Sequence, residues 1–507
     1  MQRTKRSILN VSVSLITDII IMGSAFIVQR YFLRVLGSEY NGINGLFTRI
    51  ITMLSLADMG IGSAIIYHLY KPVAEDDYDT INSLLHFYKK CYMAIAAAVL
   101  IVGMLIAVFL PQMVVTSEIQ DNIFFIFGLF LIDCLCSYFL LAYRRSLLFA
   151  YQKNYVLDTV HFCCYMVQIV VQIFVLLQFK SYIAFLITKT VSKCIENIII
   201  AIYINIHYRF TKVKVIKPLD NDIQKDIVKK VKALLFHKIG AFFVQGSDGI
   251  VITMILGLTV MGKFTNYEMI RSGAAALINK MFETLTASVG NFLLDSDMRR
   301  RYEVYKNIDF INFWLFGCTS VILYCALRPL ITLWIGQEYL FSSAVVFIYV
   351  INFYIQGMKA SILTFKNGAG IFFEDRRIPL AEAAVNVALS IALAKPLGVT
   401  GVMLGTIISS GVWFLYSYPK YVCSPLLGMK YRTYIWLTVQ HLLLVIAVLI
   451  LSRYVTDIWN VNNIWGQIVI NVLVPTIIFH AIFFIIYGRS KPMKYFIGLI
   501  KKFALLK

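Results

Sequence analysis

The sequence predicts an all-α integral membrane protein. Of its 507 residues, 59% are hydrophobic and only 15% are charged, whereas roughly 25% of a soluble domain is charged. Apolar stretches long enough to cross a hydrocarbon core of about 30 Å recur along the whole chain. Basic residues collect in alternate loops, as the positive-inside rule requires of a multi-pass protein. We therefore expect about 14 transmembrane helices of about 20 residues each.

The expected spans follow one another with short connections. Each is a predominantly apolar run bounded by polar or turn residues. In chain order they cover residues 8–29, 42–69, 91–112, 122–143, 155–178, 182–206, 233–257, 269–292, 308–333, 341–364, 378–394, 398–418, 433–452 and 465–487. The connections assigned to the outer side are residues 30–41, 111–121, 178–182, 258–268, 334–341, 395–397 and 453–463. None is long enough for an outer domain, and we expect both termini on the cytoplasmic side.

The spans divide into two groups of six and a final pair. Six spans return the chain to its starting side, as in parallel repeats. We expect an N-terminal lobe at 1–206, a cytoplasmic linker at 207–232, a C-terminal lobe at 233–420, and two last spans with a basic tail at 421–507. An offset of 225 residues places Gly37 over Gly262, which is weak support for a repeat.

The linker is expected to end in an amphipathic helix that lies on the inner membrane face. Ile223, Ile227, Val231 and Leu234 follow one another at helical spacing among charged residues.

Composition also excludes several classes of function. The formal charge of +20 is explained mostly by the inner loops, so nucleic acid is not an expected partner. The chain has no catalytic Ser/His/Asp or Cys/His spacing, no P-loop and no Gly-rich dinucleotide turn. We therefore expect no enzyme activity, no metal and no cofactor, with H⁺ or Na⁺ as a coupling ion.

Cations inside the spans are the most informative candidates for a site. A cation at membrane depth costs from about 3 to more than 10 kcal/mol unless it faces water, a partner or a ligand. Arg49 can hold a phosphate through two parallel hydrogen bonds, and Asp58 lies about 180° round the helix from it. Lys280 has Glu283 on its own helix face, so a local ion pair competes with a ligand role. The candidate cavity cations are Arg49, Lys280, Lys359 and Arg271.

Carboxylates inside the spans could bind a coupling ion or pair with these cations. Asp248 lies in the segment QGSDG at 245–249, where the glycines allow close helix approach. It is either an ion site or the partner of Arg49 or Lys280. The other candidates are Asp58, Glu283 and Asp18.

Two further groups are interpreted as structural. Lys189, Lys193 and Glu196 share one face of the sixth span, and we expect them to pair locally. His161 begins the segment HFCC at 161–164, which resembles a metal cluster but is better explained by apolar packing.

Several segments together resemble a known family. They are residues 36–40 (LGSEY), 56–60 (LADMG), 264–271 (FTNYEMIR), 286–292 (TASVGNF), 333–336 (LWIG), 351–355 (INFYI) and 398–409 (GVTGVMLGTIIS). In order and spacing the chain is similar to Wzx-type polysaccharide flippases of the multidrug/oligosaccharidyl-lipid/polysaccharide exporter superfamily. The resemblance covers most of the chain.

The resemblance implies two six-helix lobes around a central cavity, two further helices, and alternating access. It implies export of undecaprenyl-pyrophosphate-linked oligosaccharide units to the outer leaflet of the bacterial cytoplasmic membrane. Membrane lipids, a polymerase and glycosyltransferases would then be the partners. A lipid II flippase remains an alternative because it shares the plan and an anionic substrate. A drug/cation antiporter remains another, although it would need an acidic cavity.

Overall fold

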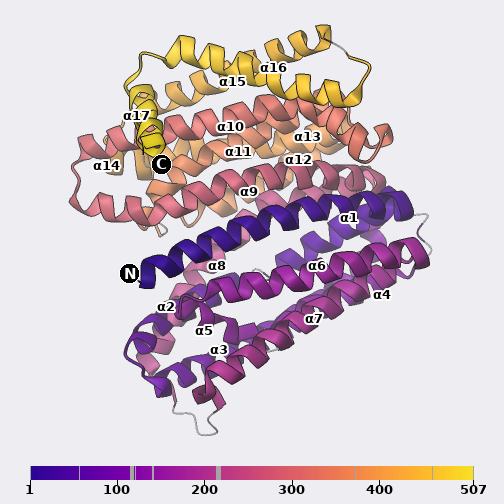
Figure 1. Ribbon diagram of the computed structural model, residues 1–507, viewed down its shortest axis with the longest axis vertical. Helices are drawn as coiled ribbons and strands as arrows, with labels where there is room; N and C mark the ends of the chain where they lie inside the picture. The colour runs from indigo at the N-terminus through magenta and orange to yellow at the C-terminus, as the bar shows by residue number, and fades with distance from the viewer. Residues whose placement is uncertain are drawn as a thin grey trace. The chain divides into compact units, whose positions relative to one another are not determined.

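The structure is a computed structural model in which every described element is helical (Figure 1). It describes residues 2–55, 58–114, 119, 121–139, 142–212, 218–371, 373–459 and 461–505. Within these ranges the side chains of 2–15, 58–60, 63–64, 142, 212, 229–245, 287 and 499–505 are not described. No β-strand occurs in the described ranges, and the expected all-α class is confirmed.

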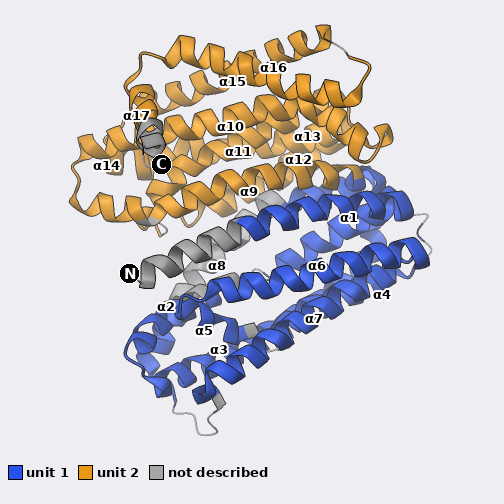
Figure 2. Ribbon diagram, viewed as in Figure 1, with its two compact units in different colours: residues 1–262 blue, residues 263–507 orange. Residues whose placement is uncertain are grey.

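The chain forms two compact units, which are described separately. Unit 1 comprises residues 1–262 and unit 2 comprises residues 263–507 (Figure 2). The boundary falls near the start of a helix, at Gly262, rather than in the inner linker. The expected lobe limits at 206, 233 and 420 concern an evolutionary repeat and stay a prediction.

Unit 1 is a bundle of helices, most of them long. Its α-helices are α1 (Gln2–Leu54), α2 (Asp58–Ala74), α3 (Tyr78–Met113), α4 (Ile123–Phe139), α5 (Arg145–Ala150), α6 (Asn154–Phe179), α7 (Tyr182–His207) and α8 (Asn221–Leu256). Helix α6 packs against α1 and α7, and α7 packs against α4 (Figure 1). Rings hold α1 to α4, because Phe47 makes edge contacts with Phe127 at 5.2 Å and with Phe130 at 5.7 Å.

Unit 2 contains the remaining helices. They are α9 (Leu258–Asp295, whose first residues belong to unit 1), α10 (Met298–Trp334), α11 (Ser343–Gly368), α12 (Ile378–Leu397), α13 (Val399–Val412), α14 (Ser424–Leu427), α15 (Tyr431–Ile458), α16 (Ile464–Tyr487) and α17 (Lys491–Leu505). Between α13 and α14 the backbone widens into π-helix at Trp413–Ser417 and Pro419–Cys423. Insertions of this kind are frequent at functional sites.

The helices have the length and composition of membrane spans. Among the described residues, nine are long and apolar enough to cross a bilayer. They are Ile16–Leu54, Tyr78–Met113, Asn154–Phe179, Met298–Trp334, Ser343–Gly368, Ile378–Leu397, Val399–Leu427, Tyr431–Ile458 and Ile464–Tyr487. Two shorter apolar helices, Ile123–Phe139 and Gly246–Leu256, coincide with expected spans. The chain is thus a multi-pass membrane protein.

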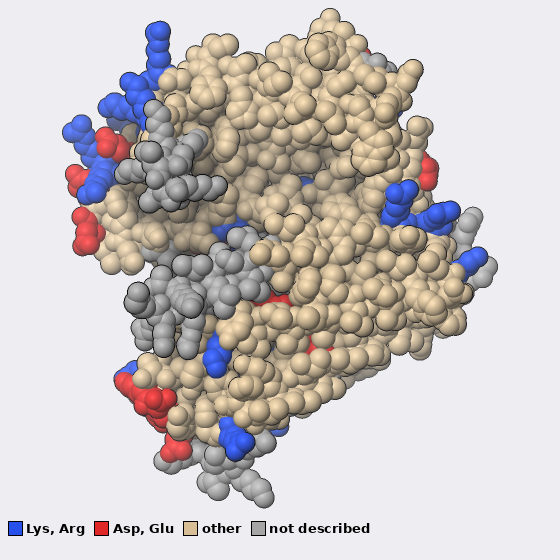
Figure 3. All heavy atoms as spheres, viewed as in Figure 1, with Lys and Arg blue, Asp and Glu red and all other residues tan. Residues whose placement is uncertain are grey.

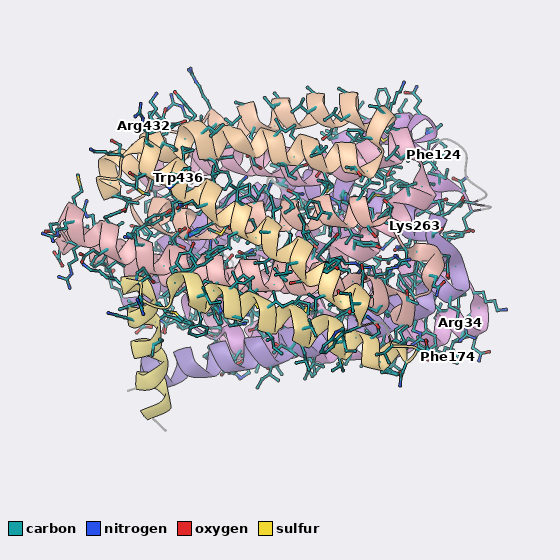
Figure 4. The ribbon with its side chains drawn as sticks, turned by 90° about the horizontal axis from the view of Figure 1, so that it is seen from above. Arg34, Phe124, Phe174, Lys263, Arg432 and Trp436 are labelled. Carbon is teal, nitrogen blue, oxygen red and sulfur yellow. The ribbon has the colours of Figure 1, made fainter. Side chains whose placement is uncertain are left out.

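The outer faces of the helices suit lipid. On α6, Val167 and Val170 are 65% and 67% exposed, which would be unfavourable in water. Uncharged side chains cover most of the face of each unit, and charged ones gather near the helix ends (Figure 3). In unit 1, Arg34, Phe124 and Phe174 lie toward the same end; in unit 2, Lys263 lies at the end opposite Arg432 (Figure 4). Both placements agree with the expected loops.

Two local expectations were wrong in detail. The expected span 42–69 covers the end of α1 at Leu54 and the start of α2 at Asp58, and residues 56–57 between them lie outside the described residues. The expected outer connection 30–41 is shorter than predicted, because helix continues on both sides of Gly37, whose non-helical φ of 84° separates two helices at a kink within α1. The expected amphipathic helix does not stand apart, since residues 221–256 form the single helix α8, with no proline to interrupt it.

A close crossing of α1 and the start of α9 lies within unit 1. A Cβ added at Gly42 would lie 2.2 Å from the Leu258 carbonyl oxygen, and one added at Gly262 would lie 2.0 Å from the Ser38 oxygen. Only glycine lets two helix backbones approach so closely. The contact is reciprocal at an offset of 220 residues, which also relates Gly37 to Gly257, the other glycine with φ near 90°. The geometry therefore favours a repeat offset of 220 over the expected 225.

Candidate functional site

The strongest predicted cation, Arg49, lies against a glycine of α8. Its side chain is half-buried on α1, and a Cβ added at Gly249 would lie 2.3 Å from Arg49 Nε and 2.4 Å from Cδ. The space that Arg49 occupies therefore depends on the missing side chain at position 249. The preceding residue, Asp248, is 5% exposed. The structure thus brings Arg49 and the QGSDG segment together within unit 1.

The other predicted residues of unit 1 lie elsewhere. Asp18 is exposed on α1. Asp58 begins α2, and its side chain is outside the described residues.

In unit 2, two predicted cations are held by carboxylates. Arg271 donates from Nε and Nη2 to the two oxygens of Glu268, at 2.7 and 2.8 Å. The Tyr349 hydroxyl donates to the same carboxylate at 2.7 Å. Lys359 Nζ lies 2.8 Å from Glu382 Oε1, and the two side chains are 11% and 5% exposed. Both cations therefore have a structural role, whatever else they do.

Glu382 is the centre of a buried cluster beside the π-helical segment. It accepts a hydrogen bond from Trp413 Nε1 and another from Ser410 Oγ at 3.3 Å. Lys366, whose Nζ lies 2.6 Å from Asp375, also faces the Trp413 ring at 5.2 Å.

Lys280 and Glu283 remain the other two candidates of unit 2. Lys280 is half-buried on α9, and Glu283 is exposed one turn further along the same helix.

A cavity of about 700 Å³, lined by charged and aromatic side chains, lies within the described part of unit 1. Such a volume lies within the range of about 300–1,000 Å³ that is usual for small-molecule sites. Helices α2 to α7 line it through Gly62, Ile66, Tyr88, Tyr92, Asp133, Ser137, Arg145, Ser146, Phe149, His161, Tyr165, Gln168, Lys189, Lys193, Glu196 and Asn197. We call this space the unit 1 cavity.

One group of charges in the unit 1 cavity is centred on Glu196 of α7. Arg145 Nη2, from α5, lies 2.8 Å from Glu196 Oε1 and donates to Asn197 Oδ1 at 2.6 Å. His161 Nδ1, from α6, lies 3.0 Å from Glu196 Oε2. The carboxylate therefore joins three helices.

A second group is centred on Asp133 of α4. Lys193 Nζ lies 3.2 Å from Asp133 Oδ2, and Lys189 Nζ lies 3.9 Å from the same oxygen. Lys189 also faces the Phe130 ring at 5.2 Å. Both lysines come from α7, and the side chains of Lys189 and Lys193 are 38% and 35% exposed. Both side chains are therefore partly accessible.

Aromatic and amide groups complete the lining. The Tyr88 hydroxyl donates to the Tyr92 hydroxyl at 3.0 Å, and Tyr165 stacks on His161 at 5.9 Å. Gln168 donates to Gln172 at 3.3 Å. The cavity therefore offers hydroxyl and amide groups as well as charge.

The electrostatic balance of the unit 1 cavity favours an anion. Its lining carries three basic side chains (Arg145, Lys189 and Lys193) and two carboxylates (Asp133 and Glu196), besides His161. Among the described residues, no group of three His, Cys, Asp or Glu side chains could hold a metal ion.

Sequence reasoning missed this cavity. It expected Lys189, Lys193 and Glu196 to pair with one another, whereas the structure pairs both lysines with Asp133 of another helix. It also took His161 for a packing residue, whereas His161 contacts Glu196. Three charges spaced four and three residues apart in one span were the available signal, because such spacing places them on one helix face.

Comparison with known proteins agrees with the fold. A structure described as the lipid II flippase MurJ in an inward closed conformation matches with a TM-score of 0.62 and 14% identity, over 94% of this chain and 99% of that one. An inward-facing multidrug resistance MATE family transporter of the MOP superfamily matches with a TM-score of 0.62 and 12% identity, over 81% and 96%.

A MOP superfamily transporter from Pyrococcus furiosus, described as having a binding pocket of reverse polarity, matches with a TM-score of 0.52 and 13% identity, over 79% and 92%. No curated protein matches the chain.

The family follows from the sequence match. Residues 7–286, more than half of the chain, match the family described as polysaccharide biosynthesis protein. The resemblance to the polysaccharide flippases is confirmed at this level, and the helices have the fold of MOP superfamily transporters. The chain therefore belongs to the polysaccharide biosynthesis protein family.

Proposed function

We propose that the protein flips undecaprenyl-pyrophosphate-linked oligosaccharide repeat units from the inner to the outer leaflet of the bacterial cytoplasmic membrane. The observation that carries the proposal is Arg49, a half-buried cation on the apolar helix α1 that lies against Gly249 of α8, in a member of this family. The product would supply O-antigen, capsule or exopolysaccharide synthesis. The protein acts as a transporter by alternating access, and not as an enzyme.

The chemistry of such a substrate suits these helices. A lipid-linked sugar has a pyrophosphate that loses its hydration on entering hydrocarbon, at a cost of several kcal/mol or more. Cations and polar groups inside the protein replace that hydration. The polyprenyl tail can stay in the bilayer, against apolar helix faces such as that of α6.

We assign roles to the predicted residues on this basis. Arg49 in unit 1 and Lys280 in unit 2 are each assigned to bind phosphate of the substrate, since both are half-buried cations in expected spans. Lys359 and Arg271 are weaker candidates because Glu382 and Glu268 engage them.

Asp248 couples transport to H⁺ or Na⁺, since it is a buried carboxylate beside the Arg49 site. Asp58, Glu283 and Asp18 are the other carboxylates that could take this role.

Partners and orientation belong to the same proposal. Both termini lie on the cytoplasmic side, where glycosyltransferases assemble the lipid-linked unit. A polymerase receives the unit on the outer side. Nucleic acid has no part in this process.

The test begins with deletion of the gene in its own host. We expect the lipid-linked repeat unit to accumulate on the inner leaflet, and mass spectrometry of the lipid extract identifies it. Complementation then compares the wild type with Arg49→Ala, Lys280→Ala and the surface control Lys225→Ala at equal protein level. Polymer export should fall for the first two variants only. Normal export by both would remove their assigned role, and an unchanged lipid pool would refute the function.

A lipid II flippase is the second candidate, and one observation favours it. The match to the MurJ structure covers 94% of this chain, against 81% for the MATE transporter. The same deletion separates the two functions, because accumulation of lipid II would favour this candidate.

A further inference from the structure

We propose that the unit 1 cavity is itself a phosphate-binding site, one that takes the phosphate or pyrophosphate ester of the lipid-linked substrate. This inference rests on the proposed function for its choice of ligand. It differs from the role given to Arg49 and Lys280, because the lining of this cavity includes none of the four candidate cavity cations named from the sequence.

The pairing of charges in the cavity suits an exchange of anions. Each carboxylate has two cationic or basic partners: Asp133 has Lys189 and Lys193, and Glu196 has Arg145 and His161. An incoming phosphate can therefore take one partner from each carboxylate. Neither Asp133 nor Glu196 is then left as an isolated buried charge, which would be costly. A site with one partner for each carboxylate would not allow this exchange.

Arg145 retains hydrogen-bonding capacity for such a ligand. Both of its hydrogen bonds to α7, to Glu196 and to Asn197, come from Nη2. Among the described residues, Arg145 Nε and Asn197 Nδ2 are buried donors with no protein acceptor. A buried donor without an acceptor is unfavourable, and a phosphate oxygen is a strong acceptor. A small movement of the guanidinium from Glu196 toward the ligand would give the buried Nε donor of Arg145 a phosphate oxygen as its acceptor.

Two of the three cations, Lys189 and Lys193, lie along one face of α7 with Glu196, which binds the third cation, Arg145 of α5. Lys189, Lys193 and Glu196 are four and three residues apart on the same helix face, and a rise of about 1.5 Å per residue spreads them over about 10 Å. A pyrophosphate has two phosphoryl groups to place along such a line. Arg145 at one end and Lys189 at the other can contact different groups.

The rest of the lining suits the first sugar. Tyr88, Tyr92 and Tyr165 offer ring faces and hydroxyl groups, and Gln168 offers an amide. Aromatic rings pack on apolar faces while their hydroxyl groups form hydrogen bonds. The volume of about 700 Å³ would hold the phosphate-bearing end of the substrate.

Binding of defined probes to the full-length protein in lipid nanodiscs tests the inference. The probes are inorganic pyrophosphate and farnesyl pyrophosphate, a short polyprenyl ester, measured by isothermal titration calorimetry. Lys193→Gln should weaken binding roughly ten- to a hundredfold, as loss of a charged hydrogen bond does. Asp133→Asn should tighten binding, because it removes the carboxylate that competes for both lysines. Lys225→Gln, which changes a lysine that is 81% exposed, should have no effect.

The opposite effects of Lys193→Gln and Asp133→Asn separate a binding role from a structural one. If the Lys193–Asp133 pair only stabilised the fold, both variants would lower the melting temperature. Their affinities for the probes would then not change in opposite directions. Absence of binding by the wild type, or equal affinity in both variants, overturns the inference. If Lys193→Gln does not fold, tighter binding by Asp133→Asn still supports the site, and unchanged binding refutes it.

The two probes identify the source of the phosphate. Tighter binding of farnesyl pyrophosphate supports a lipid head group as the ligand. Equal or tighter binding of inorganic pyrophosphate supports the site but assigns it to a free anion.

Export by the wild type is scored separately in the deletion host. Normal export with no effect of the variants on affinity removes this inference alone, whereas failed export with the expected affinities removes the proposed function and leaves an anion site.

Discussion

Gly249→Ala tests whether the position of Arg49 matters for transport. The added Cβ would lie 2.3 Å from Arg49 Nε, 2.4 Å from Cδ and 3.0 Å from Cζ. An ordinary van der Waals contact needs at least 3.4 Å, so the side chain must move by about 1 Å. Arg49 is flexible and can make this movement without unfolding α1 or α8. The substitution therefore displaces the guanidinium and keeps its charge.

We expect the displacement to reduce transport strongly. A misplacement of about 1 Å in a group that contacts the substrate can cost roughly a hundredfold in rate. Flipping of a fluorescent lipid-linked oligosaccharide in reconstituted liposomes measures the rate, with melting temperature as a check on folding. Gly128→Ala on α4 is the matched control, because a Cβ there meets nothing within 4 Å. Arg49→Ala shows the effect of losing the side chain altogether.

Two results would refute the reasoning. Transport by Gly249→Ala at the wild-type rate, together with loss in Arg49→Ala, would show that the charge suffices and its position does not matter. Normal transport by both variants would show that Arg49 takes no part. Loss of folding in Gly249→Ala would contradict the expectation that a flexible side chain yields.

Two further predictions concern stability. Gly42→Ala should lower the melting temperature, because its Cβ would lie 2.2 Å from a backbone oxygen that cannot move by itself, and overpacking costs about 1–3 kcal/mol. The control is Gly23→Ala, whose Cβ would meet nothing within 4 Å. Equal melting temperatures of the two variants would contradict the close crossing. Lys359→Ala should destabilise unit 2 by about 3–5 kcal/mol, because it leaves the buried Glu382 without its cation. Adding Glu382→Gln should recover much of this loss in a denaturant titration, and no recovery would argue against the pair.

Much of the fold could be predicted because apolar length is a local property. In the described residues, each expected span overlaps a helix or a pair of helices, and the all-α membrane class was confirmed. Errors arose where one residue decides a break. The connection expected at 30–41 is reduced to a kink between two helices at Gly37, and the linker continues into α8 where two helices were expected. A hydropathy pattern does not fix where a helix ends, because a helix can continue beyond its apolar run.

The candidate site could be predicted only in part. Charge inside a span is visible in the sequence, which is why Arg49, Lys280 and Lys359 were singled out. Partners on other helices are not visible, and Asp133 is 60 residues from Lys193 along the chain. The lysines were therefore assigned to the wrong partner. Glu196 was likewise joined to Arg145 and His161 only by the packing of α5, α6 and α7.

The sequence by itself determined the membrane class, the family resemblance and the presence of costly cations within the spans. These depend on composition and on local spacing, which need no knowledge of the fold. The tertiary structure alone decided which cations are held by carboxylates, where a cavity remains, and why position 249 must be small. Ion pairs and cavities arise between helices that are distant in sequence, so they exist only once those helices have packed.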